Sequence, residues 1–408
     1  MGRKEKKVRM SKTFRSPAQK HPATNKAPRI DVVQSDTPVL GSGGFTALWK
    51  SAGQQILAVT YWFDPVPHSG PYAVTVRFSG RRVDVKGRLH PGDRFVQDET
   101  IEEVIPGSGP ISLTARVRDI HPGEWAVTAH ILGSASSVGE LREHENMTDA
   151  AVLLHPATGF WRKWAPSAET AELVSTCPTP IARVPGILPG IWGAMVALGI
   201  AFALALQFLV ISLGHVKIGP WLAVSLGAIV VGIAGAKVWY IVLYRREHSM
   251  NGWCIQGFIT AAILTALVLL VAFDVPIGVF LDVITPGLLV AMAVGRVGCF
   301  FAGCCGGPPN GSRWGVWSSD QRVGARRIPT QLLELTLALS LGLGSLVAIL
   351  VHGPAGGALF IAAMATYTLM RQGILHLRTE LRKTKYGGLV TAALAALVLV
   401  AALVLLAL

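Results

Sequence analysis

Charged residues are scarce in this chain. Only 15% of its 408 residues are Asp, Glu, Lys or Arg, against about 25% in soluble domains, and 51% are apolar. The scarcity is concentrated in one half: residues 181–408 hold 15 basic and 6 acidic residues, whereas residues 1–180 hold 22 and 18. This composition excludes a uniformly soluble protein. It predicts a soluble N-terminal half followed by a half embedded in a membrane.

Cysteine is sparse too, and the five present lack the spacing of a disulfide scaffold or of a paired Cys-x-x-Cys zinc site. Three of them, Cys299, Cys304 and Cys305, fall within seven residues beside an apolar segment. Because no His or acidic residue lies near them to complete a ligand set, we expect no metal site and no cofactor. The alternatives left open are buried packing, a redox pair, or a thiol that transiently carries a lipid or acyl group.

The first 40 residues form a basic tail. Residues 1–30 contain ten Lys or Arg and one acidic residue, so they supply +9 of the net charge of +13. Residues 1–40 show no apolar periodicity, which favours a disordered, solvated tail, and we infer no nucleic-acid binding from it. The basic start is not followed by the apolar stretch of a secretory signal.

Residues 41–135 predict an antiparallel β-sandwich of the immunoglobulin or fibronectin type. Short runs of β-branched and aromatic residues alternate there with turns rich in Pro and Gly, and the runs lie at 56–63, 72–78, 111–117 and 124–132. In YAVTVRF (72–78) the apolar side chains fall on every second residue and would share one face. We expect a binding or spacing module, joined to the membrane half by a polar linker at 136–185.

Residues 186–408 predict a seven-helix membrane domain. A helix that crosses a bilayer needs about 20 apolar residues. Seven such segments occur, at 190–213, 219–244, 253–273, 276–302, 329–352, 355–371 and 388–408. Small residues recur within them, which lets transmembrane helices approach closely.

Ionisable residues in these segments carry a desolvation cost of several kcal/mol, so each indicates a possible function. They are Lys237, Asp282, Arg296, Glu334 and Arg371. Lys237 can extend its amine to the membrane surface and Asp282 can lie near a helix end, which gives both a purely structural alternative. Arg296 and Arg371 are stronger candidates, since a guanidinium binds phosphate through two hydrogen bonds. Arg371 follows Tyr367 by four residues and shares its helical face.

Several blocks of the membrane half together resemble the prolipoprotein diacylglyceryl transferase family. GRVGCFFAGCC (295–305) keeps five of the eight fixed positions of the family signature G-R-x-G-N-F-x-N-G-E. IPTQLLEL (328–335), which is similar to the family's P-x-Q-x-x-E, and YTLMR (367–371) follow in order. GAKVWYIVLY (235–244) is similar to G-A-R-x-x-Y-x-x-x-Y, and GWCIQGFITA (252–261) lies where the family has a His-Gly-Gly segment. The order and spacing of these blocks make the resemblance specific.

The resemblance implies a multi-pass enzyme of lipoprotein biosynthesis in a bacterial plasma membrane. It would move a diacylglyceryl group from phosphatidylglycerol to the lipobox cysteine of a lipoprotein precursor. It implies catalytic roles for Arg296, Arg371 and Tyr367, with the arginines stabilising charge that develops on the phosphate. Substrate contacts are implied for six further residues: Lys237, Gln256, Gly298, Cys299, Gln331 and Glu334.

The chain also departs from the family pattern. The two Asn and the Glu of the signature become Cys299, Ala302 and Cys304, the His becomes Gln256, and the acid four residues beyond the second arginine becomes Leu375. Gln cannot act as a general base at neutral pH, whereas His can. A second hypothesis is therefore a catalytically silent relative that binds lipid or a membrane partner. A third is a membrane thiol-redox protein that uses the three clustered cysteines.

Two arguments about orientation disagree. The polar breaks at 244–251, 303–328 and 371–386 lie on the same side as the N-terminal half and hold most basic residues of the membrane half, so the positive-inside rule places that side in the cytoplasm. The resemblance implies the opposite, because lipoprotein cysteines are modified after export. We expect the catalytic loops and the N-terminal half to face the outside, since arginines of a phosphate site bias the charge count.

Overall fold

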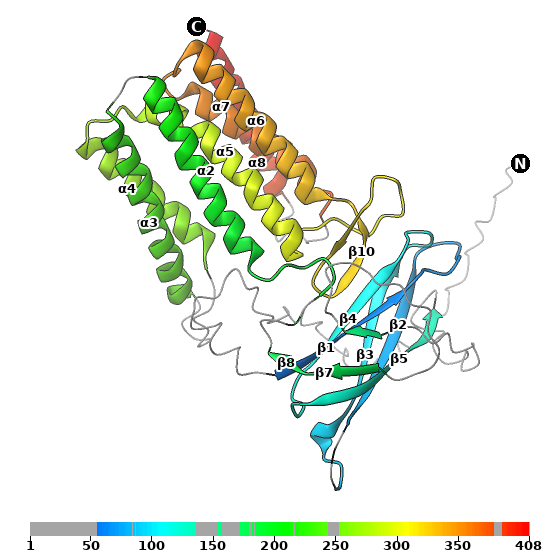
Figure 1. The fold of residues 1–408 in the computed structure, drawn as a ribbon. Helices are drawn as coiled ribbons and strands as arrows, with labels where there is room; N and C mark the ends of the chain where they lie inside the picture. The colour runs from blue at the N-terminus through cyan, green and yellow to red at the C-terminus, as the bar shows by residue number, and fades with distance from the viewer. Residues whose placement is uncertain are drawn as a thin grey trace, which may run out of the picture. The chain divides into compact units, whose positions relative to one another are not determined.

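The computed structural model describes residues 55–83, 85, 87–135, 154–156, 172–178, 182, 184–214, 217–243, 253–378 and 386–407 (Figure 1). The predicted tail at 1–40 and most of the predicted linker at 136–185 lie outside these residues. The described part contains a domain of β-strands, here called the β-domain, and a helical membrane domain.

The β-domain contains two sheets around one core. Its strands are β1 (Gln55–Phe63), β2 (Tyr72–Arg82), β3 (Arg94–Val104), β4 (Ile111–Val117), β5 (Glu124–Ala135), β6 (Leu154–Pro156), β7 (Glu172–Ser175) and β8 (Cys177–Pro178). One sheet has the order β3-β2-β5-β7, and the other contains β6, β1 and β4, with β8 paired to β1. All the described pairings are antiparallel. The β-rich N-terminal region is confirmed, while its immunoglobulin-like type stays a prediction.

The alternation in β2 explains which face enters the core. Tyr72, Val74, Val76 and Phe78 are all at most 3% exposed, while the residues between them are partly or fully exposed. They pack with the fully buried Trp125 of β5 and with apolar residues of β1 and β4. The four predicted runs therefore correspond to β1, β2, β4 and β5. The prediction missed β3, an edge strand whose charged side chains mask its alternation.

A hairpin from the membrane half completes the second sheet. Strands β9 (Val316–Ser319) and β10 (Val323–Arg327) lie between two transmembrane helices, and β10 pairs with β4 through Val323–Leu113 and Gly324–Ser112. Val323 and Ala325 belong to the β-domain core. The β-domain thus includes strands from outside the predicted range 41–135, among them β6, β7 and β8 from within the range 136–185.

Seven helices in the described part are long and apolar enough to cross a membrane, as predicted. They are α2 (Ile191–Leu213), α3 (Ile218–Leu243), α4 (Ile255–Ala272), α5 (Ile277–Ala302), α6 (Thr330–His352), α7 (Ala358–Leu375) and α8 (Gly387–Ala407). Most ends lie within two residues of the predicted ones. The largest difference is in α7, which continues to Leu375 because the polar residues after Arg371 remain helical.

Helix α5 lies between α2 and α6 (Figure 1), and it also contacts α7. The α2–α5 crossing depends on a small residue, because a Cβ at Gly287 would lie 2.6 Å from the Ala203 carbonyl oxygen. Leu289 and Ala293 of α5 pack with Ala338 of α6 and Tyr367 of α7 in one buried cluster. This packing brings the C-terminal half of α5 next to α6 and α7.

Asp282 in α5 stabilises the start of α7. Its Oδ2 accepts hydrogen bonds from the backbone N–H groups of Ala355 and Gly357, at 2.7 and 2.8 Å, and its Oδ1 accepts one from Phe360 at 3.0 Å. The side chain is fully buried. A carboxylate at a helix N-terminus satisfies amides that lack partners within the helix. Asp282 is therefore a structural residue, in agreement with the structural alternative drawn from the sequence.

Candidate active site

The centre of the candidate site is a buried ion pair between α5 and α6. The Arg296 Nη2 lies 2.5 Å from the Glu334 Oε2, and the Glu334 side chain is 0% exposed. Arg296 is in the penultimate turn of α5, and Glu334 is in the second turn of α6. The C-terminal end of α5 therefore meets the N-terminal end of α6 at this ion pair. Arg296 also lies close enough to Tyr367 and Cys299 to interact electrostatically with both.

Two more arginines approach the same carboxylate. Arg378, just beyond α7, donates from Nη2 to the Glu334 Oε1 at 2.5 Å, and the Arg371 Nε lies 3.7 Å from that oxygen. Three guanidinium groups against one carboxylate leave an excess charge of +2 (3 − 1). Arg378 is almost buried, whereas Arg371 is 37% exposed and is the most accessible of the three. Such a group of fixed positive charges is suited to a phosphate.

Sequence reasoning missed Arg378, because it lies in a stretch read as a polar break. One signal was available: Arg378 follows Arg371 by seven residues, which is two helical turns, so both side chains lie on nearly the same face if the helix continues. The helix ends at Leu375, but the turn after it keeps Arg378 within reach of Glu334.

Several buried polar atoms near the ion pair lack hydrogen-bond partners within the described residues. They include the Gln331 Oε1 and the Arg371 Nε. The Gln331 amide nitrogen is used, since it donates to the Cys304 carbonyl at 2.8 Å. Buried polar groups in folded proteins nearly always have partners. Unsatisfied polar atoms beside a cationic cluster therefore indicate the place of a polar ligand group.

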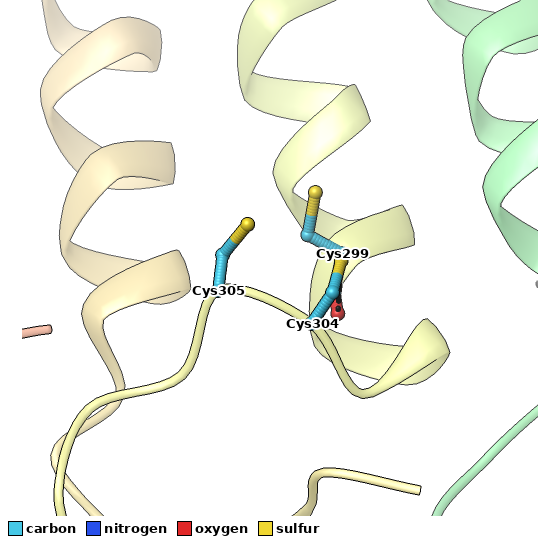
Figure 2. A group of neighbouring side chains, drawn as sticks. All are labelled: Cys299, Cys304 and Cys305. Atoms are coloured by element: carbon cyan, nitrogen blue, oxygen red, sulfur yellow. Dashed lines mark hydrogen bonds between the residues drawn. The ribbon is translucent and has the colours of Figure 1, made fainter. Parts of the chain in front are cut away.

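The cysteines of the signature block gather at the end of α5 (Figure 2). Cys299, Cys304 and Cys305 place their sulfur atoms within 4.8 Å of one another. The helix ends at Ala302, and the following Gly303, with a φ of +70°, reverses the chain, so the Cys304 N–H donates to the Cys299 carbonyl at 3.1 Å. The Cys304 Sγ also donates to the Cys299 carbonyl, at 3.7 Å.

The remaining residues predicted for the site take other positions. Gly298 is a packing residue in the structure, since a Cβ there would lie 3.0 Å from the Met195 side chain of α2. The Lys237 Nζ lies over the Trp253 ring, 5.3 Å from its centroid. Gln256 is exposed on the first turn of α4. The substrate roles of Lys237 and Gln256 stay predictions.

The fold and the site define a class: a multi-pass membrane protein whose helix ends assemble a buried, positively charged site suited to a phosphate group. The family model of prolipoprotein diacylglyceryl transferase matches residues 183–408, more than half of the chain, and the chain belongs to this family. It is accordingly a bacterial multi-pass membrane protein.

Curated relatives agree with the family assignment. A phosphatidylglycerol–prolipoprotein diacylglyceryl transferase of Dehalococcoides mccartyi is 30% identical over 236 residues, covering 53% of this chain and 90% of that protein. The protein of the same name from Acaryochloris marina is 26% identical over 226 residues, covering 51% and 82%. The one from Clostridium tetani is 28% identical over 153 residues, covering 35% and 61%. No solved structure matches the chain.

Proposed function

We propose that this protein transfers a diacylglyceryl group from phosphatidylglycerol to the cysteine thiol of a lipoprotein precursor. The observation that carries the proposal is the convergence of three arginines on Glu334, which leaves two positive charges available beside a membrane-embedded helix end. The names of the curated relatives specify the same donor and acceptor.

In the reaction, the acceptor sulfur attacks the glycerol carbon that carries the phosphodiester. A carbon–sulfur bond forms, the carbon–oxygen bond breaks, and glycerol phosphate leaves with an additional negative charge; the thiol proton is released. Charge therefore develops on the phosphate, and guanidinium groups held in place before the reaction stabilise it at little reorganisation cost. Arg296 and Arg371 contact this phosphate, and the Tyr367 phenol beside Arg296 orients the donor.

Glu334 and Gln331 act as positioning residues. Glu334 holds the three arginines in fixed relative positions. Gln331 fixes the cysteine-containing turn through its hydrogen bond to Cys304, and its free carbonyl oxygen points to a second polar contact with substrate.

In this proposal the end of α5, the start of α6 and the β-domain all lie on the outer side of the plasma membrane. The strand pairing supports a common side of the membrane for the helix ends and the β-domain. Strand β4 precedes the first transmembrane helix and β10 follows the fourth, yet the two strands pair. Four crossings return the chain to its starting side. Export of the acceptor before modification favours the outside. Protease added to intact cells should cleave the β-domain, and full protection with cleavage only after lysis would contradict this orientation.

The transferase activity is tested with purified full-length protein in detergent, phosphatidylglycerol labelled in its acyl chains, and a lipobox peptide. We expect a thioether-linked peptide product and release of glycerol phosphate, and no product with the same peptide carrying Ser in place of its Cys. Binding of phosphatidylglycerol without any product, under conditions in which a characterised relative works, would instead favour a silent lipid-binding relative.

A further inference from the structure

The three clustered thiols are arranged like one face of a metal site. Their sulfur atoms lie within 4.8 Å of one another, whereas tetrahedral Zn²⁺ with bonds of about 2.3 Å requires sulfurs about 3.8 Å apart. Small side-chain rotations close this difference. Cys305 adopts a φ of +60°, an unfavourable value for a residue with a side chain. Figure 2 shows that this turn directs its sulfur towards Cys299 at the end of α5.

Contacts from α6 hold the two non-helical cysteines in place. The Gln331 Nε2 donates to the Cys304 carbonyl, and the Thr330 Oγ1 donates to the Cys305 carbonyl, both at 2.8 Å. Thr330 and Gln331 are themselves buried. These bonds fix the backbone of the turn that carries both cysteines, which limits the positions that their sulfur atoms can take. The sulfurs are nevertheless not sealed off, since Cys304 and Cys305 keep partial exposure.

The electrostatic surroundings favour an anionic complex. A Zn²⁺ ion with three thiolates has a formal charge of −1 (2 − 3), and a fourth thiolate makes it −2. The adjoining arginine cluster has an excess of +2, and its member Arg296 interacts directly with Cys299. The positive charge of the cluster therefore favours an anionic complex at the neighbouring cysteines.

We propose that Cys299, Cys304 and Cys305 bind one Zn²⁺ ion through three thiolates and leave a fourth position open, where the thiol of the acceptor cysteine binds. The metal part of this inference stands on the cysteine geometry alone, and the role of the fourth position rests on the proposed transferase function. Three protein ligands with one open position are typical of catalytic zinc sites.

The metal supplies a function that Gln256 cannot provide. The position where the family has a His carries Gln256, which cannot accept the thiol proton. A thiol that coordinates Zn²⁺ loses its proton to solvent, so the metal generates the thiolate nucleophile without a general base. The zinc-bound sulfur then attacks the glycerol carbon, the thioether forms, and glycerol phosphate leaves; the neutral thioether is a weak ligand and dissociates. Zn²⁺ undergoes no redox change.

Metal content tests the site directly. Full-length protein purified in detergent should contain about one zinc per chain by elemental analysis, and each of the variants Cys299→Ser, Cys304→Ser and Cys305→Ser should lower this by about tenfold or more. Cys177→Ser and Cys254→Ser, which change the two remaining cysteines, should retain the metal. If a serine variant fails to fold, the wild-type protein can be compared before and after chelation and again after Zn²⁺ is added back. Maleimide should label the three thiols in the metal-free protein and should not label them in the zinc form.

Cobalt tests the open position without requiring turnover. Metal-free protein loaded with Co²⁺ should show thiolate-to-cobalt charge-transfer bands, and a lipobox peptide should shift its visible bands while the same peptide with Ser should not. Wild-type protein with no bound metal, or with two of the thiols in a disulfide, overturns the site. Bound cobalt with no response to the Cys peptide overturns the role of the fourth position.

The outcomes of the transfer assay separate this inference from the proposed function. Zinc-free protein that forms the thioether at the full rate overturns the metal's role and leaves the transferase function standing. Zinc-loaded protein that binds the Cys peptide but forms no product overturns the transferase function and leaves the metal site standing. Product formation that falls about tenfold or more on chelation and returns with Zn²⁺ supports both.

Discussion

Single residues decide the electrostatics of the candidate site, and Glu334 has the largest effect. A fully buried carboxylate is unfavourable unless it is paired, and here three guanidinium groups pair with it. The arginines in turn repel one another and stay together only because the carboxylate lies between them. One side chain therefore fixes both the charge of the site and the positions of the three guanidinium groups around it.

Replacing Arg296 by Ala should lower the transfer rate by about 10²–10³, because a positioned donor to the developing charge is lost. Arg296→Lys should recover little of it, since an ammonium cannot reproduce the two-point geometry of a guanidinium. The rate is measured with labelled phosphatidylglycerol. Arg313→Ala, at an exposed arginine of the α5–α6 connection, is the matched control and should keep the wild-type rate. Equal rates for the Arg296 and Arg313 variants would remove Arg296 from the mechanism.

Replacing Glu334 by Ala should destabilise the folded protein by about 3–5 kcal/mol, the usual result of removing one partner of a buried ion pair. The excess charge of the cluster rises from +2 to +3. Glu334→Gln should be less destabilising, because the amide oxygen still accepts a hydrogen bond. Thermal unfolding in detergent gives the order of stabilities. A Glu334→Ala protein as stable as wild type would show that the arginines do not depend on this carboxylate.

At the scale of elements, the chain joins helices and strands through polar groups that the hydrophobic pattern does not specify. Asp282 belongs to α5 but serves as the cap of α7. In the β-domain, Asp93 precedes β3 and accepts hydrogen bonds from the His121 ring, the His90 N–H and the Arg82 side chain. Both carboxylates are buried and both fix one element against another.

Replacing Asp282 by Asn should destabilise the membrane domain by about 1–3 kcal/mol, since one carboxylate oxygen becomes an NH₂ group that faces backbone donors. Hydrogen exchange should increase at the first turn of α7 in particular. The matched control is Asp274→Asn, at an exposed residue, which should change the stability by less than about 0.5 kcal/mol. Unchanged exchange at α7 in the Asp282 variant would contradict the capping role.

The Asp93 carboxylate should make the β-domain less stable in acid. Its hydrogen bond to His121 is the main reason that its pKa lies well below the usual value, and the His90 N–H and Arg82 add to the effect. A lowered folded-state pKa stabilises the fold above the unfolded pKa of about 3.9, and this contribution is lost as the pH falls from there towards the folded-state pKa.

Asp93→Asn should therefore increase hydrogen exchange in β2 and β3 at neutral pH, and the difference from wild type should shrink as the pH falls below about 4. Asp98→Asn removes an exposed ion pair with Arg77 and should have little effect at any pH. A difference between wild type and Asp93→Asn that stays constant with pH would exclude this titration as the cause.

At the scale of the whole molecule, the β9–β10 hairpin joins the membrane half to the β-domain. Trp317 of β9 stacks on Trp62 of β1 with ring centroids 5.6 Å apart, and its Nε1 donates to the Pro110 carbonyl at 3.1 Å. The hairpin begins at Val316, in the same connection as the cysteine turn, and ends just before α6, so the β-domain is connected to the segment that carries the candidate site.

Trp317→Ala should weaken the attachment of the hairpin by about 0.5–1.5 kcal/mol for the ring pair alone, and the lost hydrogen bond adds to this. Amide exchange in β10 should increase, while exchange in β2 and β5 should not change. Trp314→Ala is the matched control, because that ring is 72% exposed on the same segment. Equal protection of β10 in both variants would show that the strand pairing holds without the tryptophan.

The sequence by itself determined the seven helices, four strands of the β-domain and five residues of the arginine site, Arg296, Gln331, Glu334, Tyr367 and Arg371. These depend on local periodicity and on motif spacing, which the chain carries in order. Arg378, the β9–β10 pairing and the cysteine cluster depended on the tertiary structure. Cys304 lies five positions after Cys299, and a continued helix would keep their side chains apart. The chain reversal at Gly303 and the contacts from Thr330 and Gln331 bring the sulfurs together, because packing of α6 against α5 sets the course of the turn between them.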